Sequence, residues 1–255
     1  MGTAPLFLVE ELPASGSVLL DGPEGRHAAA VKRIRVGEVV RLGDGRGAVG
    51  RAHALAVAKD SVEFALDEVV HHPAPVPRVV LAQALVKGDR GELAVELATE
   101  AGVDAILPWR AARCVARWEQ GPRGEKALAR WRSTVREAAK QARRPWIPEV
   151  GEPVSTADLA ARGGPALVLH ENAGAVLSAA DLPADGEVLL VVGPEGGVSE
   201  EELATLAAAG ARPVRLGPEV LRASTAAAVA LGAIGVLTGR WCERDAAPPA
   251  PSART

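Results

Sequence analysis

The sequence predicts an α/β protein with a mainly parallel sheet, preceded by a smaller domain that is rich in β-strands. From residue 79 onward, short apolar runs alternate with segments of helical periodicity, as in strands joined by crossover helices. Before residue 71, the apolar runs are short and separated by turn residues, a pattern typical of hairpins. Between the two regions, the three prolines of His71 to Arg78 restrict the backbone to extended conformations and indicate a linker.

The domain boundaries follow from these changes. We expect a small β domain over residues 1–72 and an α/β domain over residues 73–243. Residues 244–255 are rich in proline and alanine and are expected to form a disordered tail. In the second domain, strands are predicted over VVLAQAL, VDAILP, ALVLH, EVLLVVG and PVRLG. Helices are predicted over residues 125–143, over SEEELATLAAAG, and over residues 89–101, the last with Leu93, Leu97 and Ala98 on one face.

The composition is that of an ordinary globular protein, with 48% hydrophobic residues and a formal net charge of −3. Two cysteines, Cys114 and Cys242, are too few for a disulfide framework or a cysteine-rich zinc site. The five histidines show no metal-ligand spacing, so no bound metal is expected.

The N-terminal residues lack a basic segment followed by a long apolar stretch, so a cytoplasmic protein is expected. The longest uncharged run, residues 223–239, is mostly small residues and is shorter than the roughly 20 strongly apolar residues of a membrane span. It is predicted to be a buried helix or a helix at a subunit interface.

The net charge hides an uneven distribution. Residues 110–144 carry 11 basic and 3 acidic side chains, whereas residues 151–255 carry 7 and 13. A local basic block of this kind is typical of polyanion binding, although a solvated helix face is the plainer interpretation. A second basic cluster comprises Arg26, Lys32, Arg33 and Arg35 in the first domain. Two basic clusters on two domains suggest a shared RNA-binding cleft.

Three glycine-containing segments are candidates for ligand binding. Residues 43–47 (GDGRG) precede β-type alternation rather than a helix, so a tight hairpin is expected. Residues 193–197 (GPEGG) follow an apolar strand and precede a helix whose Ser199 and Glu202 form a capping box. Glutamates at that helix start disfavour a phosphate there. Residues 216–226 again join a strand to a helix, so the two junctions either build one pocket or are ordinary turns.

The order of several motifs resembles a known family. The chain resembles the SPOUT class of RNA methyltransferases, and most closely the RsmE type. The resemblance rests on the motif GPEGG-x-S-x-x-E-L followed by LG-x-x-V-LR-x-x-TA. Supporting segments are Gly25-Arg26-His27 with residues 31–37 (VKRIRVG), residues 87–90 (KGDR) with 98–103 (ATEAGV), Arg113-Cys114, Trp131, and residues 137–144 (EAAKQARR).

The resemblance implies an enzyme dependent on S-adenosylmethionine that methylates N3 of a uridine in 16S ribosomal RNA of the small subunit. It implies a trefoil-knotted parallel sheet with a smaller N-terminal PUA-like β-barrel domain, and a homodimer in which the alanine-rich helix after Arg222 packs near the interface. The cofactor would be held by residues from the knot, namely Leu169, Gly193, Pro194, Glu195, Gly196, Leu216, Gly217, Leu221, Ser224 and Thr225.

Arg222 is the candidate catalytic residue, because a cation near the reacting base would stabilise negative charge on the uridine oxygens. The alternative is that Arg222 only organises its loop. Many members carry glutamate where this chain has Ser224, so any role of that carboxylate is in doubt here. RNA contacts are expected from Arg26, Lys32, Arg33, Arg35, Arg113, Lys140, Arg143 and Arg144.

Two other functions remain open on the sequence. One is a related knotted enzyme that acts on transfer RNA or on a ribose hydroxyl, against which the family-like N-terminal segment argues. The other is an RNA-binding module without activity, against which the intact glycine loop argues.

Overall fold

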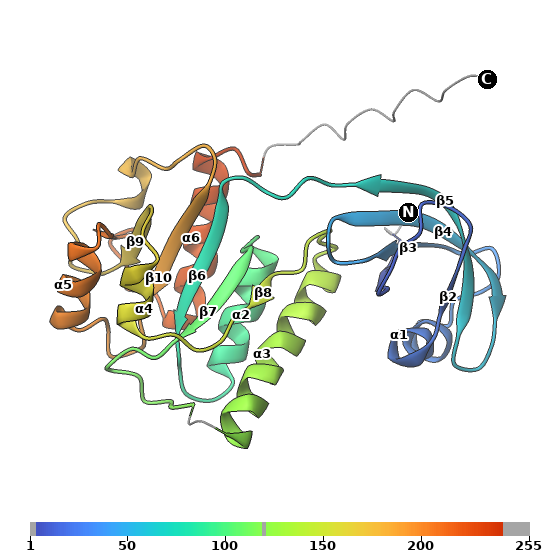
Figure 1. The fold of residues 1–255 in the computed structure, drawn as a ribbon, viewed down its shortest axis with the longest axis horizontal. Helices are drawn as coiled ribbons and strands as arrows, with labels where there is room; N and C mark the ends of the chain where they lie inside the picture. The colour runs from blue at the N-terminus through green and yellow to red at the C-terminus, as the bar shows by residue number, and fades with distance from the viewer. Residues whose placement is uncertain (1–3, 119–120, 242–255) are drawn as a thin grey trace.

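The structure, a computed structural model, describes residues 4–118 and 121–241 and contains two sheets joined by residues 72–77 (Figure 1). The first domain consists of β1 Leu6–Leu8, β2 Ser17–Leu20, α1 Gly22–Arg26, the π-helix η1 His27–Val31, β3 Val39–Gly43, β4 Ala48–Val57 and β5 Val62–His71. The second has strands β6 Arg78–Ala84, β7 Ala105–Trp109, β8 Glu149–Val150, β9 Ala166–Leu169, β10 Glu187–Val192 and β11 Arg212–Val214. Its helices are α2 Arg90–Glu100, α3 Pro122–Gln141, α4 Thr156–Ala161, the 3-10 turn η2 Leu177–Ala179, α5 Glu200–Ala208 and α6 Ala223–Leu237. The predicted tail, residues 244–255, lies outside the described residues.

The N-terminal sheet is a half-barrel with the strand order β1-β3-β4-β5-β2. Its alternating side chains bury a core around Phe7, Leu42 and Phe64. The predicted hairpin is confirmed, because β3 and β4 pair antiparallel on either side of residues 44–47. Gly45 and Gly47 both have positive φ there, at 70° and 106°, which glycine adopts at little cost.

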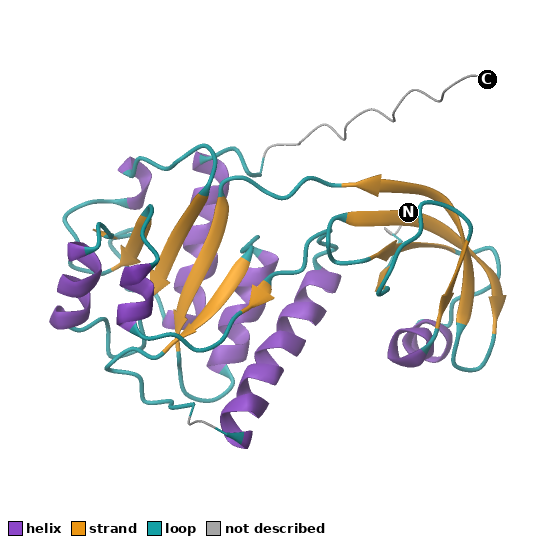
Figure 2. Cartoon of the chain, viewed as in Figure 1, coloured by secondary structure: helices purple, strands orange, loops and turns teal. Residues whose placement is uncertain are grey.

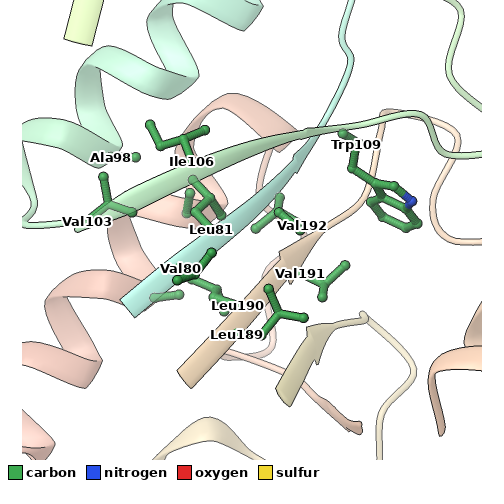
Figure 3. Packing of buried hydrophobic residues seen from close by; sticks show 14 of the residues in the cluster. Val80, Leu81, Ala98, Val103, Ile106, Trp109, Leu189, Leu190, Val191 and Val192 are labelled. Carbon is green, nitrogen blue, oxygen red and sulfur yellow. The ribbon is translucent and has the colours of Figure 1, made fainter. Parts of the chain in front are cut away.

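The C-terminal sheet has the order β11-β9-β10-β6-β7-β8, and all of its pairings are parallel. Strands covered on both faces are expected to be continuously apolar, and β6 and β10 are buried along almost their whole length. Figure 3 shows Val80, Leu81 and Ile106 beside Leu190 and Val192 in this core. The predicted α/β class is confirmed.

The helices form two groups around this sheet (Figure 2). Helix α2 packs against both α3 and α6, whereas α4 packs against α5. On α3 the spacing of Leu128, Trp131 and Val135 places one apolar face inward, as predicted. The predicted face of α2 is partly wrong. Leu93 is 41% exposed, whereas Ala98 is buried as predicted, and Ala94 and Val95 are buried as well.

The two domains meet at the β3–β4 hairpin and at the end of α3. The amide of Gly47 donates to the carbonyl of Pro145, and the amide of Ile147 donates to that of Gly45, both at 3.0 Å. An ion pair joins Lys140 Nζ on α3 to Glu24 Oε1 on α1 at 2.7 Å. Polar contacts from several segments therefore hold the domains in one arrangement.

The route of the chain after β11 decides where the site lies. β11 is an edge strand, yet α6, which follows it, packs on α2 and on the central strands β6 and β10. Residues 215–222 make this return, and the resemblance places the knot here. In the part of the chain that the structure describes, no helix is long and apolar enough to cross a bilayer.

Candidate cofactor and RNA site

A cavity of about 640 Å³ opens at the carboxyl ends of β9, β10 and β11. Its walls are residues 169–172 after β9, residues 192–198 after β10, residues 214–224 together with Ala226 after β11, and Arg90 at the start of α2. Parallel sheets place ligand sites at the carboxyl ends of strands, and this volume suits a small organic ligand. The two glycine-containing junctions therefore build one pocket, not two separate turns.

The glycines of residues 193–197 are required by close packing and by backbone conformation. A Cβ on Gly193 would lie 2.9 Å from Val198 Cγ2, and a Cβ on Gly196 would lie 3.2 Å from Arg113 Cβ. Gly197 has a φ of +74°, which favours glycine. The loop thus presents backbone, rather than side chains, to the cavity at these positions.

Glu202 ties this loop to two other segments. The predicted capping box is confirmed, since Ser199 Oγ accepts from the amide of Glu202 and Glu202 Oε2 accepts from the amide of Ser199, both at 3.2 Å. Glu202 Oε1 also accepts from the amide of Ala112 at 2.8 Å and from Thr156 Oγ1 at 2.9 Å. The spacing of Ser199 and Glu202 predicted the cap, but the sequence carries no signal for these long-range partners.

Arg113, in the segment after β7, contacts the same glycine loop. Its guanidinium Nη1 donates to the carbonyl of Gly196 at 3.1 Å, and its side chain is exposed. Its neighbour Cys114 is buried, and burial raises the pKa of the thiol. Arg113 is therefore placed beside the glycine loop with its charge facing solvent, while Cys114 is a packing residue.

Most of the residues that the sequence predicted for cofactor binding line the cavity. They are Leu169, Gly193, Pro194, Glu195, Gly196, Leu216, Gly217, Leu221 and Ser224, together with the candidate catalytic residue Arg222. Thr225 lies in the first turn of α6, where its hydroxyl donates to the carbonyl of Arg222 at 3.2 Å, and it does not line the cavity. Ser224 is buried.

The cavity also holds the charged residues Arg90, Glu171, Arg215 and Glu219, together with His170, none of which was among the predicted site residues. His170 and Arg215 directly follow β9 and β11. The rule that sites form at the carboxyl ends of parallel strands would have found both. The cavity therefore contains cations and carboxylates in similar number, as a zwitterionic ligand requires.

The residues predicted to bind RNA divide into two groups. Side chains of the first group are exposed, namely Arg26, Lys32, Arg33, Arg35, Arg113 and Arg143. Lys32 and Arg143 line a hollow between the domains.

Lys140 and Arg144 do not fit the prediction. Lys140 is 11% exposed and pairs with Glu24, and Arg144 is 12% exposed and lies 3.6 Å from Asp104. Arg144 also donates to the carbonyl of Thr99, and burial lowers its pKa to about 10. Arg144 is used inside the protein, and Lys140 is paired with Glu24 although it borders the hollow between the domains. Both are therefore left out of the proposed RNA-binding set.

Comparison with known proteins agrees with the geometry. Residues 72–235 match the RNA methyltransferase domain family, and residues 20–67 match the RNA methyltransferase PUA domain family. The chain is 50% identical over 246 residues to ribosomal RNA small subunit methyltransferase E of Mycobacterium bovis. The match covers 93% of this chain and 94% of the relative. This chain belongs to that family of RNA methyltransferases.

A more distant relative and two solved structures extend the similarity. The Bacillus subtilis methyltransferase of the same name is 30% identical, over 90% of this chain and 93% of the relative. The crystal structure of the Neisseria gonorrhoeae methyltransferase E, bound to S-adenosyl methionine, has a TM-score of 0.83 at 29% identity and covers 92% of this chain and 98% of its own. A Legionella pneumophila protein in complex with the same cofactor has a TM-score of 0.82 at 29% identity and the same coverage. The predicted SPOUT-type fold with a PUA-like domain is confirmed.

Proposed function

We propose that this protein transfers a methyl group from S-adenosylmethionine to N3 of a specific uridine in 16S ribosomal RNA of the small subunit. The observation that carries the proposal is the cavity after β9, β10 and β11, which is lined by both glycine-containing junctions. The chain also belongs to a family of RNA methyltransferases. The presence of a PUA domain beside it supports an RNA substrate.

The residues of the cavity fit the proposed methyl donor. Its backbone-lined loop at residues 193–197 allows close approach of a flat ring, and Leu169, Leu216 and Leu221 offer apolar contacts. Glu171, Glu195 and Glu219 supply negative charge for a ligand that carries a sulfonium and an ammonium group. When bound, S-adenosylmethionine supplies a methyl group that N3 of the uridine attacks while the carbon–sulfur bond breaks and its electrons stay on sulfur.

The chain's own residues must then position an unpaired base and stabilise its charge. N3 is buried in base pairing within a duplex, so the target uridine must be single-stranded or flipped out. Its N3 proton passes to water, which leaves negative charge on the flanking carbonyl oxygens. Arg222 lines the cavity and is proposed to stabilise that charge.

The exposed basic residues are proposed to bind the RNA backbone. Phosphate contacts fix register without reading sequence, and side chains that face solvent on both domains suit that task. The proposed set is Arg26, Lys32, Arg33, Arg35, Arg113 and Arg143.

We further propose a homodimer formed through α6, in a cytoplasmic protein. The helix leaves Val229, Val236 and Leu237 between 48% and 70% exposed, and Trp241 directly after it is 56% exposed. An apolar stripe of this kind on one helix suits a second copy of the same helix. Size-exclusion chromatography with light scattering tests the dimer.

The decisive experiment for the reaction is nucleoside analysis of 16S ribosomal RNA from a deletion strain. Loss of N3-methyluridine, and its return with the wild-type gene, is the expected result. Methylation that persists, or that is lost from transfer RNA or from a ribose instead, would contradict the proposal.

Two variants separate donor binding from catalysis. Arg222→Ala should abolish methylation while calorimetry still detects S-adenosylmethionine binding. Gly196→Val should lose that binding, because its Cβ lies 3.2 Å from Arg113 Cβ and its branched side chain needs more room. Turnover retained by Arg222→Ala would show that this residue only organises its loop.

A further inference from the structure

Arg90 lines the methyl-donor cavity from a wall that the proposed machinery does not use. It is the first residue of α2 and follows the carboxyl end of the central strand β6. Arg222 enters the same cavity from the segment between β11 and α6. Arg215, directly after β11, lines the cavity as well, so three arginines border it, and Arg90 is the one among them that follows β6.

The contacts of Arg90 do not give it a structural role. Within residues 4–118 and 121–241, the single polar partner of its guanidinium is Glu195, with Arg90 Nη1 3.7 Å from Glu195 Oε1. That distance is too long for a hydrogen bond, and the Arg90 side chain is 54% exposed. Exposed pairs of this kind contribute little to stability.

The buried arginine Arg240 provides the contrast. It is 6% exposed, lies 2.8 Å from Asp104 Oδ2, and donates to the carbonyls of Pro77 and Gly102. An arginine that holds this fold together thus has several short contacts, whereas Arg90 has one long one. The guanidinium of Arg90 is free to exchange Glu195 for a better acceptor.

The chemistry of uracil calls for two cations. N3 lies between two carbonyl carbons, so loss of its proton spreads negative charge over O2 and O4 on opposite sides of the ring. A single guanidinium faces only one of these oxygens. Donors that are already in place where charge develops give the largest rate effects in enzymes.

We propose that Arg90 is a second catalytic residue, which contacts one carbonyl oxygen of the target uracil while Arg222 contacts the other. In the absence of RNA, the guanidinium lies 3.7 Å from the carboxylate of Glu195. The base displaces Glu195, its N3 proton passes to water, and N3 then attacks the methyl carbon as the carbon–sulfur bond breaks. This inference rests on the proposed uridine methylation.

The test uses Arg90→Gln in the full chain with a 16S RNA fragment and S-adenosylmethionine under single-turnover conditions. Wild-type protein is assayed first, with mass spectrometry of the product nucleoside. If wild-type protein forms no N3-methyluridine, the proposed function fails. If it does, the Arg90 variants then test the inference alone.

The expected result is a rate lower by about 10²-fold at neutral pH, the effect of removing one such donor. Affinity for S-adenosylmethionine, measured by calorimetry, should be unchanged. The deficit should shrink as the pH rises. A nearby cation favours the deprotonated base, so its removal raises the pKa of the N3 proton in the complex and moves the rate plateau to higher pH.

Two further variants serve as controls. Arg90→Lys keeps the charge but loses the planar fork, so its rate should fall between those of wild type and Arg90→Gln. Arg212→Gln makes the same chemical change at the opposite end of β11, where the guanidinium donates to the carbonyl of Asp181, and should leave rate and pH profile unchanged.

Three outcomes would overturn the inference. One is a wild-type rate and pH profile for Arg90→Gln. Another is a loss of cofactor affinity that accounts for the whole deficit, which would make Arg90 a donor-binding residue. The third is an unchanged pH profile combined with weaker salt dependence of RNA binding, in which the slope of log affinity against log salt falls by about one. That result would mark Arg90 as a phosphate contact instead.

Discussion

Lys140 and Arg144 illustrate how single residues depart from expectation. Both belong to a basic segment that suggests RNA binding, yet both neutralise acidic partners inside the protein. Arg143 between them has its side chain exposed and adopts a positive φ of 55°. Neighbours in sequence therefore have different roles, because the turn after α3 points adjacent side chains in different directions.

Cys114 gives a prediction that depends on its burial. The thiolate is the reactive form, and burial raises the pKa of this thiol, so less thiolate is present at neutral pH. In a Cys242→Ser variant, Cys114 should react with iodoacetamide much more slowly than an unfolded cysteine peptide. Mass spectrometry of the labelled peptide measures this, and denaturant should restore the rate. Rapid labelling of the folded protein would show that Cys114 is accessible.

Helix α5 connects the cofactor loop to its surroundings through its first turn. Local sequence decides the capping box of Ser199 and Glu202, because both partners lie within one turn. The same carboxylate then serves Ala112 after β7 and Thr156 at the start of α4. A local motif thereby sets the position of a loop that lines the proposed cofactor cavity.

Glu202→Ala should lower the free energy of unfolding by roughly 3 kcal/mol, because several donors lose their acceptor in a buried place. It should also weaken S-adenosylmethionine binding, since the loop of residues 193–197 loses its support. Denaturant unfolding and calorimetry measure the two effects. Glu200→Ala, an exposed glutamate in the same turn, is the matched control and should have a small effect. Equal effects of the two substitutions would contradict the role of the buried carboxylate.

The arrangement of the two domains is set by contacts between segments far apart in the chain. The hairpin at residues 44–47 bonds to residues 145–147, and the indole Nε1 of Trp146 donates to the carbonyl of His72 at 3.0 Å. Lys140 and Glu24 add an ion pair with both side chains largely buried. RNA that contacts both domains therefore meets a surface of defined geometry.

A double-mutant cycle on Lys140→Met and Glu24→Gln should give a coupling free energy on the order of 1–3 kcal/mol, because the pair is shielded from water. The exposed pair Arg132–Glu152 is the control, with side chains 50% and 76% exposed, and its coupling should stay below about 1 kcal/mol. Unfolding midpoints of the single and double variants supply the values. Similar coupling in both pairs would show that the contact between the domains has no special strength.

RNA binding by the whole molecule should depend on salt through the exposed cations. Lys32→Gln should weaken binding of the 16S fragment and reduce the slope of log affinity against log salt by about one. Lys59→Gln removes another exposed lysine, outside the proposed set, and should leave the slope unchanged. Fluorescence anisotropy at several salt concentrations measures both. An unchanged slope for Lys32→Gln would remove it from the RNA surface.

Much of this protein could be read from local patterns. The hairpin at residues 44–47, the capping box of α5, and most strands and helices of the α/β domain were predicted, because periodicity and turn chemistry act within a few residues. The short elements β8 and α4 were not predicted. The order of the glycine motifs further indicated the family, and most residues taken from it line one cavity. Strand order, the return of the chain to α6 and the exposed face of α2 needed the structure.

The distribution of charge separates what the sequence determines from what only the tertiary structure decides. The sequence establishes that residues 110–144 are strongly basic, since composition is local. Tertiary packing decides which cations remain available, because the acidic partners Glu24 and Asp104 approach from other elements. It likewise brings Arg90 and Arg222, which are 132 positions apart in the chain, to one cavity. Pairing and burial depend on distances in space, and spacing along the chain does not contain them.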